Sequence, residues 1–159
     1  MTPPIPATAK RAITSVTPDE LADWLKAHAQ PRYRQEQVER WLFQKWVRSF
    51  SQMASLPAAL REQLNLDFRA RSVHEIDRLD AADGTSKWLF ELADGATIET
   101  VLIRAPQRAT VCISTQVGCP VRCVYCASGR DGWVRDLEAG EIVDQVLAAC
   151  EHLGARPTN

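Results

Sequence analysis

Three cysteines lie close together in the sequence at a spacing that could hold one metal centre. They are Cys119, Cys123 and Cys126, separated by three and then by two residues. Thiolates this close together on one loop can bind a single metal ion or cluster. A structural zinc site requires a fourth ligand, and the only later candidates are Cys150 and His152. Three thiolates without a fourth ligand instead suit a [4Fe–4S] cluster that leaves one iron open.

The other two cysteines have simpler interpretations of their own. Cys150 lies on the apolar stripe of a predicted helix, where a small core residue is expected. Cys112 lies in a predicted strand, and taken alone it reads as a buried strand thiol. A zinc-stabilised RNA-binding module that uses Cys112 or Cys150 as the fourth ligand stays open at this point. Five cysteines, an odd number, argue against a closed disulfide framework and favour a cytoplasmic protein whose thiols do chemistry.

A strand, a loop and a helix are predicted to position these cysteines. Residues 110–115 are typical of a strand, residues 116–136 form the cysteine loop, and residues 138–153 carry helical spacing. This order is the first unit of an α/β repeat. Before it, residues 87–92 and 97–103 predict a β-hairpin around a glycine-containing turn.

The N-terminal part of the chain predicts three short amphipathic helices. The first begins at Thr17, with Glu20 completing a capping box. The second runs from about residue 34 to residue 48, and the third begins near Leu56, with Ser55 as its cap. The tryptophans of this region are expected to form its core rather than platforms for stacked bases.

Composition and charge narrow the class of protein. Of 159 residues, 45% are hydrophobic and 25% are charged, and no apolar run is long enough to predict a membrane span. The formal net charge of −1 hides an asymmetry, because residues 32–71 hold eight basic and four acidic side chains, a surplus of +4, and the rest of the chain carries −5. A basic segment is the expected footprint of a nucleic-acid partner, although a solvated helical face gives the same pattern.

The motifs around the cysteines resemble the RlmN/Cfr family of radical S-adenosylmethionine methyltransferases, which act on adenosine in RNA. The aromatic Tyr125 before the last cysteine also fits the radical S-adenosylmethionine signature. The similar segments are Cys112–Cys119, Cys126–Leu137, Glu141–Val146, Tyr33–Gln37, Ser49–Arg61, Asp83–Lys87 and Ile98–Val101. The resemblance extends over nearly the whole chain from about residue 17.

The resemblance implies an α/β fold in four parts. Residues 1–16 would be a flexible leader and residues 17–75 a small helical accessory domain that binds RNA. Residues 76–105 would be a β-hairpin connector. Residues 106–159 would be the start of the radical S-adenosylmethionine core, namely the first strand–loop–helix unit of a truncated partial (βα)6 barrel.

The resemblance also implies roles for five residues. Cys119, Cys123 and Cys126 would be the cluster ligands. Cys112 matches the thiol that releases a covalent protein–RNA intermediate and transiently forms a disulfide. Glu99 matches the proton acceptor, although alone it reads as an exposed strand carboxylate.

The implied reaction methylates C2 of adenosine through a methyl-cysteine intermediate and consumes S-adenosyl-L-methionine at the cluster. The implied targets are 23S rRNA at the peptidyl transferase centre and the tRNA adenosine 3′ of the anticodon. We also expect an electron donor such as flavodoxin or ferredoxin. The protein is expected to be a cytoplasmic monomer that does not bind a membrane. The C8-methylating branch of the family is the alternative, and Val117 and Arg135 favour the C2 branch.

Some features depart from the family pattern. Ser128, Asp136 and Glu138 stand where the family usually has Thr, Asn and Thr. After Val111 only 48 residues remain, enough for one strand–loop–helix unit. The rest of the S-adenosylmethionine site and the methyl-carrying cysteine would lie outside this sequence, so we expect an inactive fragment.

Overall fold

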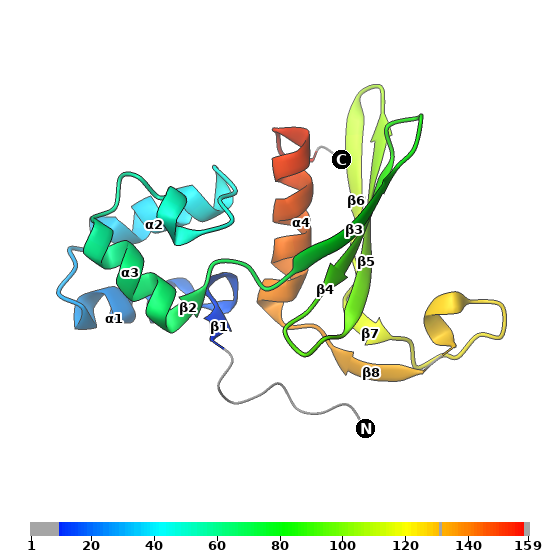
Figure 1. Cartoon of the computed structure of the whole chain (residues 1–159), viewed down its shortest axis with the longest axis horizontal. Helices are drawn as coiled ribbons and strands as arrows, with labels where there is room; N and C mark the ends of the chain where they lie inside the picture. The colour runs from blue at the N-terminus through cyan, green and yellow to red at the C-terminus, as the bar shows by residue number, and fades with distance from the viewer. Residues whose placement is uncertain (1–9, 131, 158–159) are drawn as a thin grey trace.

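The computed structural model places a bundle of three helices beside a β-sheet that a fourth helix covers (Figure 1), and it describes residues 10–130 and 132–157. The helices are α1 (Pro18–Ala27), α2 (Tyr33–Phe43), α3 (Ala58–Asp67) and α4 (Ala139–Leu153), with short 3-10 helices η1 (Ile13–Ser15), η2 (Phe50–Gln52) and η3 (Ala127–Gly129). The strands are β1 (Arg11–Ala12), β2 (Phe68–Arg69), β3 (His74–Asp80), β4 (Ser86–Glu91), β5 (Thr97–Ala105), β6 (Arg108–Cys112), β7 (Gln116–Gly118) and β8 (Trp133–Asp136).

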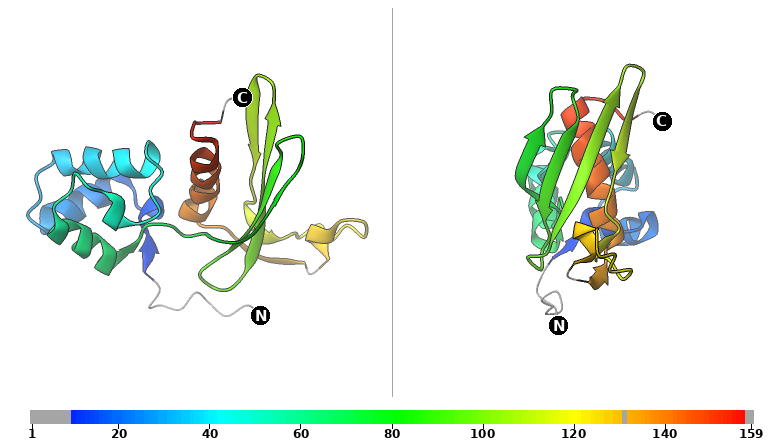
Figure 2. Two further views of the ribbon diagram at one scale, coloured as in Figure 1. Left: turned by 45° about the horizontal axis from the view of Figure 1, so that its top comes forward. Right: turned by 90° about the vertical axis from the view of Figure 1, so that its right-hand side faces the viewer.

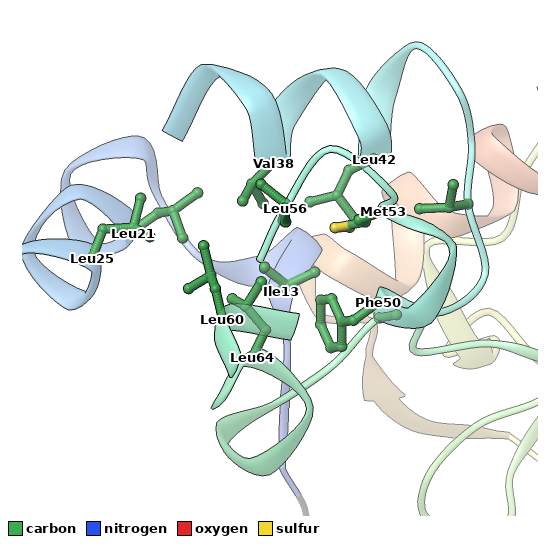
Figure 3. Packing of buried hydrophobic residues seen from close by; sticks show 12 residues of the cluster. Ile13, Leu21, Leu25, Val38, Leu42, Phe50, Met53, Leu56, Leu60 and Leu64 are labelled. Carbon is green, nitrogen blue, oxygen red and sulfur yellow. The ribbon is translucent and has the colours of Figure 1, made fainter. Parts of the chain in front are cut away.

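The helical bundle has a continuous apolar core (Figure 3). Its buried residues come from the three helices, the segments between them and the segments on either side: Ile13, Leu21, Leu25, Val38, Leu42, Val47, Phe50, Met53, Leu56, Leu60, Leu64 and Ala70. The predicted start of α1 is confirmed, because the Glu20 amide donates to the Thr17 hydroxyl and the Glu20 carboxylate accepts from the Thr17 amide. This core gives the bundle a hydrophobic interior of its own.

The segment before α1 differs from the expected leader of residues 1–16. Residues 1–9 of that leader lie outside the described residues. The remainder is part of the fold, since β1 pairs in parallel with β2 and Ile13 is only 3% exposed. Burial of Ile13 in the helical core therefore fixes the chain before α1 begins.

The second and third helices differ from their predicted bounds. The helix predicted to reach residue 48 ends at Phe43, and Trp46 adopts a left-handed backbone with φ of 51° where the chain turns. The predicted cap Ser55 was wrong: its hydroxyl accepts a hydrogen bond from the Trp41 indole at 2.8 Å, and Pro57 precedes the first residue of α3. The Ser55 hydroxyl is thus bound by a side chain fourteen positions away, a contact that local spacing does not contain.

The predicted hairpin is the centre of a larger sheet. Strands β3, β4, β5 and β6 lie in that order, and each pair is antiparallel. The connector is thus four-stranded rather than a hairpin alone, because β3 and β6 flank β4 and β5. Strand β3 is polar and mostly exposed at the sheet edge, so it lacks the apolar alternation by which strands are predicted. The expected order of strand, loop and helix is present as β6, the cysteine loop and α4.

Helix α4 covers one face of the sheet and leaves the other face open (Figure 2). The covered face buries Trp88, Phe90, Ile98 and Leu102 against α4, in a core that also includes Leu92, Val117, Leu137 and Ala149. The strand alternation places Glu99 on the opposite face. The buried core fixes the strand register, and the register places the polar side chains of the open face.

The helical bundle is joined to α4 through a buried carboxylate. Asp144 is fully buried and accepts hydrogen bonds from the Ser72 amide and hydroxyl, both at 2.6 Å, and from Thr14 at 3.1 Å. Arg71 forms an ion pair with it at 3.0 Å. At the start of α4, Gly140 donates its amide to Ser15 at 2.9 Å, and a Cβ atom there would lie 2.3 Å from the Ser15 hydroxyl.

Candidate active site

An open cleft of about 480 Å³ lies between the sheet and the cysteine loop. Its lining comes from β4, β5, the segment after β6, β7 and η3: Leu89, Thr97, Ile98, Glu99, Ser114, Thr115, Gln116, Gly118, Cys119, Ala127 and Ser128. Two predicted site residues, Glu99 and Cys119, therefore meet in one cleft although twenty positions separate them in the chain.

Glu99 projects from β5 with its carboxylate accessible to solvent. The Lys87 ammonium, from the neighbouring strand β4, lies 2.9 Å from one carboxylate oxygen, and the Glu99 side chain is 58% exposed. The Ser114 hydroxyl donates to the Glu99 backbone carbonyl at 2.7 Å. Among the described residues, the second carboxylate oxygen has no hydrogen-bond partner, so one oxygen is oriented by Lys87 while the other is available.

Cys112 lies on the same open face as Glu99. It is the last residue of β6 and is paired with Val101 of β5, and Val101 and Glu99 share one side of their strand. Its thiol is free and exposed rather than buried, which rules out the simple interpretation as a core thiol. Cys112 is not part of the cleft lining itself, so it lies beside the cleft.

Tight backbone contacts close the base of the cysteine loop. The Cys119 amide donates to the Gly132 carbonyl at 3.1 Å, and β7 pairs with β8 on either side of the loop. Gly118 has φ of 74°, and a Cβ atom there would lie 1.9 Å from the Gly132 carbonyl oxygen. Only glycine tolerates both that backbone conformation and that approach.

The tip of the cysteine loop extends into solvent (Figure 2). Tyr125 is 90% exposed, Cys126 is exposed and Cys123 is half-buried. Backbone hydrogen bonds between residues three positions apart shape the tip. They run from the Cys126 amide to the Cys123 carbonyl and from the Gly129 amide to the Cys126 carbonyl. The aromatic and the thiols are therefore available to a group bound at the loop.

The three cysteine thiols of this loop are the type of ligand that an iron–sulfur cluster requires. All five cysteines of the chain are free, and three of them share the loop, so the chemistry of the donors fits. Within residues 10–130 and 132–157, however, no three His, Cys, Asp or Glu side chains lie close enough together to hold one metal ion. The structure thus places the three thiols on one loop without bringing them to a single point.

A half-buried arginine, Arg135, anchors the far end of the cysteine loop. Arg135 of β8 makes two parallel hydrogen bonds to Glu141 of α4, at 2.8 and 2.9 Å, and a third to Asp94 at 2.7 Å. These carboxylates, Glu141 first, raise the pKa of Arg135. Although burial opposes ionisation of Asp94, the hydrogen bond from Arg135 keeps the pKa of Asp94 below its usual value.

The unusual Asp136 has a structural partner in this region. Its carboxylate accepts from the Gln116 side chain at 2.7 Å, across the pair formed by β7 and β8. This hydrogen bond links β7 to β8 at the base of the loop.

The two remaining sequence predictions concern Cys150 and the basic segment. Cys150 is only 4% exposed on α4, and burial raises the pKa of its thiol, in agreement with a core role.

Five of the eight basic residues in 32–71 are bound within the protein: Arg34, Arg48, Arg61, Arg69 and Arg71. Of these five, Arg48 and Arg71 pair with carboxylates outside the segment, so part of the surplus of +4 is neutralised within the protein.

Sequence reasoning missed the polar side chains that support the cleft. They are Ser114 and Arg135, which are half-buried, and Gln145, which is fully buried. One signal was available in the sequence, since Glu141, Asp144 and Gln145 interrupt the apolar stripe of α4. All three are at most 2% exposed. Buried polar residues require partners, so such interruptions indicate contacts with other elements.

Comparison with known proteins agrees with the geometry. The ribosomal RNA large subunit methyltransferase N-terminal domain matches residues 12–71. Two relatives named probable dual-specificity RNA methyltransferase RlmN are similar over most of the chain. The one from Staphylococcus carnosus is 44% identical over 95% of this chain and 42% of the relative, and the one from Geobacillus thermodenitrificans is 48% identical over 86% and 37%.

A solved structure shares the fold. The crystal structure of a radical SAM methyltransferase from Sphaerobacter thermophilus is 39% identical, with a TM-score of 0.86 over 91% of this chain and 42% of that chain. This mixed α/β fold is therefore similar to that of a radical SAM methyltransferase. The chain is similar to the RlmN relatives over most of its own length, and it spans about two fifths of theirs. No helix among the described residues is long and apolar enough to cross a membrane.

Proposed function

We propose that this chain supplies the RNA-binding domain and the cluster-binding loop of an adenosine C2-methyltransferase. The proposed targets are 23S rRNA at the peptidyl transferase centre and the tRNA adenosine 3′ of the anticodon. The observation that carries the proposal is that Glu99 and Cys119 line one cleft, with the exposed thiol of Cys112 on the same face of the sheet. The relatives' names, as RNA methyltransferases, agree with it.

Cys119, Cys123 and Cys126 would hold a [4Fe–4S] cluster whose open iron takes S-adenosyl-L-methionine. When bound, this group would supply one-electron chemistry on the sulfonium. The cleft beside Cys119 gives that chemistry access to a substrate base. The closed base of the loop would keep the ligands next to the cleft while the loop tip adjusts.

Two side chains of the open face would complete the reaction. The Glu99 carboxylate would accept a proton from the adenine at the oxygen that Lys87 does not contact. The Cys112 thiolate would then attack the sulfur of the methyl-carrying cysteine. An S–S bond would form as the bond from that sulfur to the methylene carbon breaks, and the carbon would take a proton to become the methyl group of the released base. Both groups are accessible, as a reaction on a macromolecular substrate requires.

The proposal also includes the RNA-binding surface, the electron donor and the cellular location of the protein. RNA would contact the exposed basic side chains of the helical bundle, such as Arg32, Arg40 and Lys45, through phosphate and shape recognition. An electron donor such as flavodoxin or ferredoxin would serve a cytoplasmic monomer. The β6–loop–α4 unit would begin a partial barrel.

A chimera tests the proposed function directly. This chain would replace the matching region of the Staphylococcus carnosus relative, and the methylated nucleosides of 23S rRNA and tRNA would be identified by mass spectrometry. We expect 2-methyladenosine, lost in Glu99→Gln and Cys112→Ala variants. The 8-methyl product would instead support the C8 branch, and absence of product beside an active parent relative would contradict the proposal.

A further inference from the structure

Gln145 of α4 makes the most complete set of side-chain hydrogen bonds near the cleft. It is fully buried. Its carbonyl oxygen accepts from the Thr100 hydroxyl at 2.7 Å and from the Ser114 amide at 2.8 Å. Its amide nitrogen donates to the carbonyls of Ser114 and Glu141, both at 2.9 Å. All the polar atoms of this side chain therefore have partners.

Gln145 hydrogen-bonds the backbone of Ser114, as a neighbouring strand would do within a sheet. Strand β6 ends at Cys112 and β7 begins at Gln116, so Ser114 lies where the chain has left the sheet. Its amide and carbonyl would lack ladder partners there, and Gln145 satisfies both. A primary amide accepts through its oxygen and donates through its nitrogen, so it can bind both the N–H and the C=O of one residue, and an asparagine side chain is one methylene shorter.

The same segment connects the candidate catalytic groups. Ser114 lines the cleft and donates its hydroxyl to the Glu99 carbonyl. Thr100, the other partner of Gln145, directly follows Glu99 on β5. Cys112 lies two residues before Ser114, and Cys119 five residues after it. One buried side chain on α4 therefore holds the two backbone segments that carry Glu99 and Cys112.

We infer that Gln145 is a positioning residue, which fixes the backbone after β6 and so sets the distance between Glu99, Cys112 and the cysteine loop. The inference rests on the proposed function for the roles of these groups, whereas the positioning itself is a property of this chain. The neighbouring residue Asp144 is equally buried but has a different role, because it binds Ser72 and so holds the helical bundle.

Amide hydrogen exchange in the chain compares the two neighbours. Gln145→Leu removes all four hydrogen bonds at similar volume, and Asp144→Asn is the matched control. We expect Gln145→Leu to speed exchange of the Ser114 amide by about tenfold or more relative to the Ser72 amide, the factor that corresponds to one buried hydrogen bond. Asp144→Asn should change that ratio in the opposite direction. An unchanged ratio in Gln145→Leu would overturn the inference, whatever the function of the chain.

The functional arm uses the chimera with RNA as substrate. Gln145→Leu should lower kcat by about tenfold or more and leave the KM for RNA unchanged, because reacting groups move while RNA contacts stay. Asp144→Asn should mainly raise the KM. A kcat that stays at the parent value, despite faster Ser114 exchange, would overturn the positioning role. An inactive parent chimera would count against the proposed function alone, since the exchange result stands without it.

Discussion

The α4–sheet framework and the cysteine loop are built in opposite ways. The framework has an apolar core of Trp88, Phe90 and Leu102, and the polar side chains buried in it are bound on several sides. The tip of the loop has exposed Tyr125 and Cys126 and is shaped mainly by short backbone contacts. Hydrogen bonds and ion pairs hold the buried polar side chains of the first region, whereas the loop tip is exposed and open to a ligand.

This difference indicates how the site divides its tasks. Glu99 and Cys112 belong to framework strands, so their positions are set before any ligand binds. Cys123 and Cys126 belong to the loop tip, whose base is closed by the contact between Cys119 and Gly132. Under the proposed function, Glu99 and Cys112 would react from framework strands, whereas Cys123 and Cys126 would hold the cluster from the exposed loop tip.

The largest expected effect comes from Asp144→Ala, which breaks the framework. Removal of this carboxylate leaves Arg71 buried without its partner, and we expect a loss of about 3–5 kcal/mol in the free energy of unfolding. Urea denaturation would measure it. Cys123→Ala, at the loop, is the matched comparison and should change the free energy of unfolding by less than about 0.5 kcal/mol. Equal losses in the two variants would contradict the division described above.

A smaller effect is expected at the boundary between framework and loop. Gly118→Ala forces a side chain into a left-handed backbone and against the Gly132 carbonyl. We expect a cost of about 1–3 kcal/mol and separation of β7 from β8. Faster exchange of the Cys119 amide, with the four-stranded sheet unchanged, would locate the damage. Wild-type protection of that amide would show that the contact does not close the loop.

The helical bundle offers an effect of about 1 kcal/mol at its surface. Thr17→Ala removes the cap of α1 and should lower the free energy of unfolding by that amount. Thermal unfolding of this variant beside Thr17→Ser, which keeps the hydroxyl, measures the contribution of the cap. A Thr17→Ser variant as unstable as Thr17→Ala would attribute the loss to the methyl group instead.

The smallest expected effect is the loss of the stabilisation from Glu20 at low pH. Hydrogen bonds from the Arg11 side chain and the Thr17 amide lower the pKa of Glu20 from 4.5 to about 2. Because the folded pKa is the lower one, the stabilisation is complete above about pH 4.5 and is lost as the pH falls toward about 2. Unfolding measured across this range should show a shallower pH dependence in Glu20→Gln. Identical slopes in the two proteins would contradict the assignment.

The sequence predicted the parts of the fold that local patterns encode. Thr17 and Glu20 marked the start of α1, and apolar spacing marked α4. Strand-forming residues marked β4, and alternation marked β5. Strand β3 could not be found, because an exposed edge strand needs no apolar face. The pairing of β6 with β5 and the burial of Ile13 depend on contacts between distant segments, which spacing alone does not contain.

The candidate site was predictable to a similar degree. Spacing identified Cys119, Cys123 and Cys126, whereas Glu99 and Cys112 required the family resemblance. That Glu99 and Cys119 share a cleft is a result of the register of β4 and β5. The role of Gln145 depends on where β6 ends, which local pattern places only to within a few residues.

Anaerobic reconstitution with iron and sulfide tests the central claim most directly. If the loop is a cluster site, the chain should bind about four iron and four sulfide with broad visible absorption near about 400 nm. Cys119→Ala, Cys123→Ala and Cys126→Ala should each abolish this absorption, and Cys150→Ala should preserve it. One tightly bound zinc without iron, or a cluster that survives Cys123→Ala, would contradict the account.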